Sequence, residues 1–89
     1  MHDQAAQALW ETHSLNALVY LIDHGRELEF TADGEAYFLS RSRAAEYVSL
    51  WHGGTEQSFD SMQALLEYAV INGRPFLSAW TEVHLQTLF

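Results

Sequence analysis

The chain has 89 residues, twelve acidic against four basic side chains, a net charge of −8 and no cysteine. The missing cysteine excludes disulfide and thiolate chemistry, and the charge argues against direct nucleic-acid binding, which needs clustered lysine and arginine. Apolar residues make up 48% of the chain, so we expect one folded domain over residues 1–89. No apolar run approaches the roughly 20 residues of a membrane span, and the first residues lack signal-peptide features, which favours a cytoplasmic protein.

The first predicted element is helical and covers residues 4–24. Asp3 is a candidate N-cap, and Ser14 offers a second helix start. The segment therefore forms either one long helix or two short ones. In the second case, residues 1–13 are a separate helical segment. Gly25 suits the left-handed position just past a helix end. The predicted core stripe, spaced i, i+3, i+4 and i+7, is Leu15, Leu18, Val19 and Ile22.

A β-hairpin is predicted over residues 27–40. Asp33-Gly34 closes it, because this dipeptide readily supplies the two positive φ angles of a type I′ turn. A two-residue loop fixes the register, so that Phe30 faces Tyr37. The predicted core face is Leu28, Phe30, Tyr37 and Leu39. The opposite face carries Glu27, Glu29, Thr31, Ala36 and Phe38.

A second hairpin is predicted after a polar connection at residues 41–45. Its strands are Glu46 to Trp51 and Glu56 to Phe59, joined by Gly53-Gly54. The inner set is Val48, Leu50 and Phe59. The outer set is Tyr47, Ser49, Trp51, Glu56 and Ser58. Tyr47 and Trp51 would also fill a core well, which leaves the opposite orientation open.

Two helices are predicted at the C-terminal end. The first opens on Asp60 in an Asp-x-x-Gln capping box and ends at Asn72-Gly73. Its apolar stripe is Met62, Leu65, Leu66, Ala69 and Val70. The second has Pro75 in its first turn and a stripe of Phe76, Trp80 and Val83, with Leu77 and Leu85 beside it.

These elements predict a two-layer α+β domain in the order α-β-β-β-β-α-α. The short turns favour a four-stranded antiparallel meander, and helices at both ends of the chain favour packing on one sheet face. The other face of the sheet is then left bare.

The residues at the turn, cap and core positions form a pattern that resembles that of small acidic bacterial and prophage-type proteins of unassigned function. The pattern covers roughly residues 26 to 83, and its members are Arg26-Glu27-Leu28-Glu29-Phe30, Gly34, Tyr37, Ser40, Phe59-Asp60-Ser61, Leu65-Leu66-Glu67, Gly73 and Trp80. Size and charge are similar to those of phage-encoded inhibitors, including anti-CRISPR proteins that imitate DNA, and of immunity proteins. No functional residue is implied by the resemblance.

Neither a metal centre nor a catalytic site is expected. The five histidines show no His-x-x-x-His spacing, and His13 and His24 would lie about 16 Å apart on one helix, too far to share an ion. There is no Gly-x-Ser-x-Gly elbow for a nucleophile and no phosphate-binding glycine loop. The sequence therefore predicts a protein that is not an enzyme and uses no cofactor or metal.

Two functional hypotheses remain, and both place the binding site on the sheet surface. In the first, the chain is a DNA-mimicking inhibitor that blocks a basic protein surface, such as that of a CRISPR effector. In the second, the chain is an interaction module or homodimer that uses the aromatic sheet face. The acidic candidates are Glu27, Glu29, Asp33, Glu35, Glu46 and Glu56. The aromatic candidates are Phe38, Tyr47 and Trp51.

Overall fold

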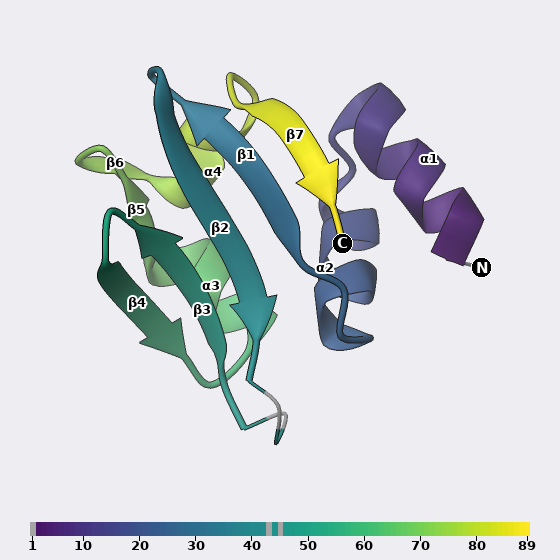
Figure 1. The fold of residues 1–89 in the computed structure, drawn as a ribbon, viewed down its shortest axis with the longest axis horizontal. Helices are drawn as coiled ribbons and strands as arrows, with labels where there is room; N and C mark the ends of the chain where they lie inside the picture. The colour runs from purple at the N-terminus through teal and green to yellow at the C-terminus, as the bar shows by residue number, and fades with distance from the viewer. Residues whose placement is uncertain (1, 43, 45) are drawn as a thin grey trace.

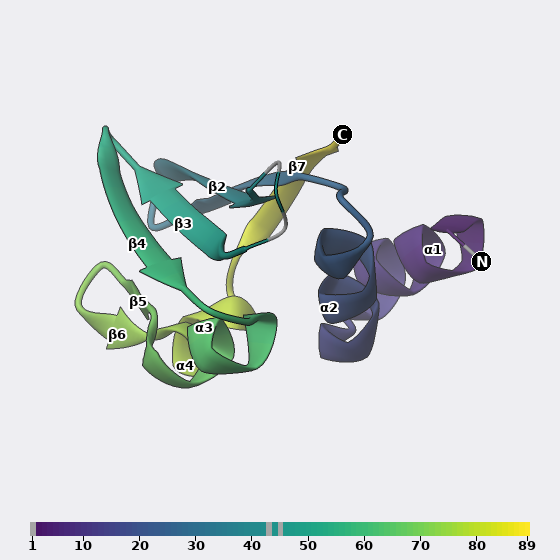
Figure 2. The same ribbon diagram turned by 90° about the horizontal axis from the view of Figure 1, so that it is seen from below.

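The computed structural model describes residues 2–42, 44 and 46–89, and it has an α+β architecture. Helices cover one side of an antiparallel sheet, and the strands curve strongly across it (Figure 1). Figure 2 shows α2, α3 and α4 on the same side of the sheet. The helices are α1 His2–Thr12, α2 Leu15–Asp23, α3 Met62–Tyr68 and α4 Phe76–Trp80. The strands are β1 Leu28–Ala32, β2 Glu35–Arg41, β3 Val48–His52, β4 Thr55–Phe59, β5 Val70–Ile71, β6 Arg74–Pro75 and β7 His84–Leu88.

Within the described residues, the main sheet has five strands in the order β4-β3-β2-β1-β7. Both predicted hairpin registers are confirmed: Phe30 faces Tyr37 in the first, and Trp51 faces Glu56 in the second. The predicted polar connection between the hairpins includes positions 43 and 45, which lie outside the described residues.

Strand β7 was not predicted, so the expected four-stranded sheet and the placing of Val83 and Leu85 in the last helix are both wrong. Leu85 and Leu88 are three residues apart, a helical spacing, yet both fall on the helix-covered side of the sheet. A register shift explains this, because β7 has one more residue than β1 between the pairs Phe30–Leu85 and Glu29–Thr87. Helix α4 therefore ends at Trp80, and the chain returns beside β1 (Figure 1).

The N-terminal segment forms two helices, separated at His13, whose φ is 54°. Asp3 lies in the first turn of α1 and is not its cap. Ser14 caps α2 as predicted, since its hydroxyl accepts the Ala17 N–H at 3.1 Å. Gly25, with φ 86°, lies just past the end of α2, as the sequence predicted.

Helix α3 differs from its prediction at both ends. Ser61, and not Asp60, is the N-cap, and the helix stops at Tyr68. Asn72-Gly73 forms the turn of the small β5–β6 hairpin, with φ values of 52° and 78°. The Gln57 side chain holds this hairpin, since it donates to the Val70 carbonyl and accepts the Val70 N–H, both at 2.9 Å.

The core lies between the sheet and the helices. Phe30 stands at its centre, stacked on Tyr37 with ring centroids 5.6 Å apart and in edge contact with Phe76 and Trp80. Leu9 of α1 is also fully buried there. Two apolar residues assigned to the predicted C-terminal helices, Val70 and Leu77, are exposed. Val70 lies in β5, beyond the end of α3, and Leu77 lies on an exposed side of α4.

Candidate functional site: an acidic and aromatic sheet face

The outer face is the side of the five-stranded sheet opposite the helices, and it carries Glu27, Glu29, Phe38, Tyr47, Trp51, Glu56 and Phe89. None of the described helices covers it (Figure 2). Trp51 is 38% exposed and Tyr47 42%, so neither ring fills the core. The buried position of Leu9 also shows that the N-terminal segment packs on the helix side and does not fold over this face.

Backbone pairing sets five of its side chains in one row across the strands. The row is Glu56 on β4, Trp51 on β3, Phe38 on β2, Glu29 on β1 and Thr87 on β7. Two aromatic rings therefore stand between two carboxylates. We call these four residues, Glu56, Trp51, Phe38 and Glu29, the central row.

Phe89 belongs to the outer face and was not among the predicted residues. It follows β7 and exchanges backbone hydrogen bonds with Glu27, at 2.7 and 3.4 Å. Its ring contacts Phe38 at 5.9 Å between centroids and is 56% exposed. Only recognition of β7 as a strand could have placed it here.

Ser49 was predicted to be an outer residue, and the register places it on the outer face, where it is only 2% exposed. Its hydroxyl lies 2.5 Å from Oε2 of Glu56 and 3.2 Å from the Ser58 hydroxyl. A carboxylate accepts only, so Ser49 donates to Glu56. A buried hydroxyl thus fixes one carboxylate of the central row.

Asp33, at the tip of the first hairpin, is engaged within the molecule. Its Oδ2 accepts from the Asn72 side-chain amide at 3.0 Å and from Arg74 at 3.4 Å. Arg74 also donates to Glu82 at 3.0 Å, and this hydrogen bond raises the pKa of the guanidinium. Asp33 therefore ties the first hairpin to the β5–β6 turn, away from the central row.

Glu35 is engaged as well. Its Oε1 lies 2.6 Å from Nε2 of His52, and the imidazole stacks on Tyr37 with centroids 4.3 Å apart. Burial raises the pKa of the Tyr37 hydroxyl, while a hydrogen bond with the Asn72 backbone opposes that shift.

Glu46 lies before β3 and is exposed. Its backbone N–H donates to the Ser42 hydroxyl at 2.9 Å, and that hydroxyl also accepts the Tyr47 N–H. Ser42 thus holds Glu46 and Tyr47 at the end of the sheet, outside the central row.

Each of the three arginines that the structure describes binds an oxygen of this chain. Their partners lie off the central row, so these cations do not neutralise its carboxylates. The contacts are Arg26 to the Phe89 carbonyl at 2.5 Å, Arg41 to Asp23 at 3.0 Å, and Arg74 to Asp33 and Glu82 at 3.4 and 3.0 Å.

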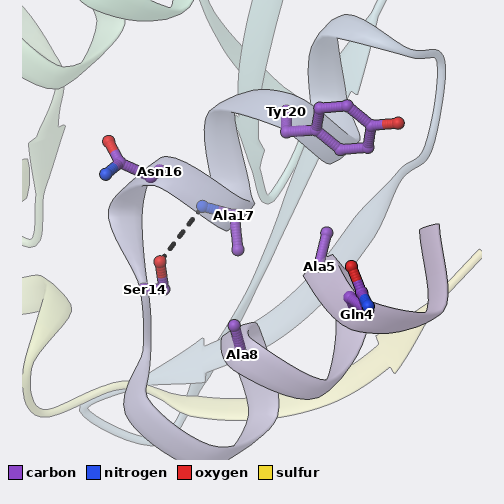
Figure 3. A pocket seen from close by; sticks show the side chains of 7 residues that line it. All are labelled: Gln4, Ala5, Ala8, Ser14, Asn16, Ala17 and Tyr20. Atoms are coloured by element: carbon purple, nitrogen blue, oxygen red, sulfur yellow. Dashed lines mark hydrogen bonds between the residues drawn. The ribbon is translucent and has the colours of Figure 1, made fainter. Parts of the chain in front are cut away.

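A second surface feature is an open groove of about 310 Å³ between α1 and α2 (Figure 3). Gln4, Ser14, Asn16, Tyr20 and three alanines line it, and Ser14 already serves as the cap of α2. The described lining holds no charged side chain, so the groove lacks the groups that would orient a charged ligand.

Across the described residues, no three histidine or carboxylate side chains gather in a way that could hold a metal ion. No helix in the same part of the chain is long and apolar enough to cross a membrane.

Comparison with known proteins adds no relative. No family model, curated protein or solved structure matches the chain.

Proposed function

We propose that this chain is a binding protein with no catalytic role, and that its outer face docks on a basic surface of a partner protein. The central row carries the proposal. It places two aromatic rings between two glutamates on a face that the described helices leave open. Aromatic side chains supply most of the binding energy at many interfaces, and complementary charge supplies specificity and fast association.

The charge of the molecule supports a basic partner. The chain carries −8, and the described arginines are engaged away from the central row. A positive partner surface is attracted over a distance of about a Debye length, roughly 8 Å at physiological salt. A nucleic acid would be repelled, so the partner is a protein.

The inhibitor hypothesis is the finer form of this proposal. In it, the basic surface is one that normally binds nucleic acid, as in a CRISPR effector, and the glutamates of the outer face take the place of phosphates. Inhibition is then steric and electrostatic, with no chemical step. Asp33 and Glu35 contribute less than expected from the sequence, because their carboxylates are already paired with Arg74 and His52.

A homodimer is the second candidate, favoured by the exposed rings of Tyr47, Trp51 and Phe89 on the same face. Two outer faces brought together would also oppose Glu27, Glu29 and Glu56 of each copy. Like charges brought together at an interface cost several kcal/mol, so a basic partner fits this face better than a second copy does.

The test is affinity capture from a bacterial lysate at low and high salt. The immobilised proteins are the wild type, Phe38→Ala/Trp51→Ala and Glu29→Gln/Glu56→Gln. We expect a basic protein that the wild type retains at low salt and that both variants lose. Release of that protein by added DNA or RNA supports the inhibitor form. Capture that is equal for all three proteins contradicts the proposal. Gel filtration tests the second candidate, which is favoured if the wild type forms dimers and the aromatic variant does not.

A further inference from the structure

The two ends of the central row have the same local geometry. In a hairpin with a two-residue turn, the pair next to the turn exchanges backbone hydrogen bonds, and hydrogen-bonded and non-hydrogen-bonded pairs then alternate. Counting from Ala32–Glu35, the pair Glu29–Phe38 is non-hydrogen-bonded. Counting from His52–Thr55 in the second hairpin gives the same result for Trp51–Glu56.

Side chains approach most closely at such positions, with Cβ atoms about 4.5–5.5 Å apart. Each carboxylate therefore stands directly beside one aromatic ring. The centres of the two pairs are two strand spacings apart, about 10 Å. The sheet thus presents one carboxylate–aromatic pair twice, at a fixed separation.

One of these pairs is held in place before any partner arrives. The buried hydroxyl of Ser49 donates to one oxygen of Glu56, and Ser58 lies within hydrogen-bonding distance of Ser49. The other Glu56 oxygen keeps its capacity to accept hydrogen bonds. A carboxylate fixed in this way loses less side-chain freedom when it binds a cation.

We propose that the outer face binds arginine in particular, with one guanidinium at each carboxylate–aromatic pair. The inference rests on the proposed function, since it names the partner chemistry of the same face. The occupant is a segment of a partner protein that carries two arginines. None of the described arginines pairs with a carboxylate of the central row, and these carboxylates provide the charge complementarity.

Arginine fits these pairs better than lysine for two reasons. Its planar guanidinium stacks on an aromatic face, and its parallel N–H groups bind a carboxylate through two hydrogen bonds. Lysine offers a compact, strongly hydrated charge that cannot stack in this way. A site that offered carboxylates alone would discriminate little between the two residues.

The experiment is a titration of the ¹⁵N-labelled protein with two capped glycine–serine peptides, followed by ¹H–¹⁵N correlation spectra at low salt. One peptide carries two arginines separated by one residue, and the other carries lysines at the same positions. We expect the arginine peptide to shift the amides of Glu29, Phe38 and Glu56 and the indole of Trp51. Its affinity should exceed that of the lysine peptide by at least about fivefold, in keeping with stacking and bidentate bonding.

Two variants test the origin of the preference, and their spectra report directly whether they fold. Phe38→Leu/Trp51→Leu should bind both peptides equally, because it keeps the carboxylates and an apolar surface but removes the rings. Glu46→Gln, which removes a charge outside the central row, should keep the preference.

Equal affinity of the wild type for both peptides overturns the arginine inference, whereas the proposed function stands if a basic partner is still captured through this face. Shifts confined to another surface, such as the α1–α2 groove, also overturn it. Both proposals fail if neither peptide binds and if substitution of Phe38 and Trp51 does not change which proteins are captured.

Discussion

The indole N–H of Trp80 donates to the main-chain carbonyl of His13 at 2.8 Å, and the two rings meet edge to face at 5.6 Å. The His13 ring nitrogen Nε2 in turn lies 3.1 Å from the Val83 carbonyl. This contact joins the break between α1 and α2 to the end of α4, residues that lie 67 positions apart. It fastens the N-terminal helices to the C-terminal part of the domain.

Trp80→Phe should therefore lower the free energy of unfolding by about 1–3 kcal/mol, because the part-buried His13 carbonyl loses its donor. Urea denaturation followed by circular dichroism measures the change. Trp10→Phe is the matched control, since Trp10 is 42% exposed, and it should change the free energy by less than about 0.5 kcal/mol. Equal effects of the two substitutions would contradict this role of Trp80.

The free energy of unfolding at alkaline pH should depend on Tyr37. Burial raises the pKa of its hydroxyl above the ordinary value of 10.0, so the unfolded chain releases this proton at a lower pH than the folded one. The contribution to stability is complete below pH 10 and is lost as the pH rises from there through the raised pKa of the folded state.

Urea titrations at pH 8 and pH 11 measure this effect. The free energy of unfolding should fall less between the two pH values in Tyr37→Phe than in the wild type. Tyr68→Phe, which alters a ring that is 69% exposed, should keep the wild-type decrease. The same decrease in all three proteins would show that Tyr37 does not contribute.

Removal of the Ser49 hydroxyl should affect both stability and binding. Ser49→Ala deletes a donor to Glu56, with an expected loss of about 1 kcal/mol in the free energy of unfolding. Because Glu56 then moves more freely, affinity for a basic partner or the arginine peptide should also fall, by about two- to fivefold. Ser78→Ala, on the exposed side of α4, is the control, and an equal loss of affinity there would remove Ser49 from the site.

Glutamates of the central row should matter more for binding than carboxylates of the hairpin tip. Glu29→Gln/Glu56→Gln and Asp33→Asn/Glu35→Gln each remove two negative charges, so the long-range field changes equally. The first variant should weaken partner binding roughly tenfold, and the second less than about twofold, since Asp33 and Glu35 are already engaged. Isothermal titration calorimetry at two salt concentrations makes the comparison, and the reverse order would support binding through the hairpin tip.

Local sequence determined most of the sheet. Asp33-Gly34 and Gly53-Gly54 adopt positive φ values at both positions, and a two-residue turn leaves one register for each hairpin. That register is enough to set Glu29 beside Phe38 and Glu56 beside Trp51. The candidate pairs could therefore be derived from the sequence alone.

Only the tertiary structure decided the C-terminal part and the surroundings of the central row. Leu85 and Leu88 have the spacing of a helix, and their strand forms because β1 offers an unpaired edge, with a register shift absorbing the extra residue. Ser49 is buried although it lies on the outer face, where its hydroxyl contacts that of Ser58. Asp33 forms an ion pair with Arg74, which belongs to a hairpin far along the chain. Turns are short-range and can be read along the chain, whereas edge pairing and ion pairs depend on which segments the fold brings together.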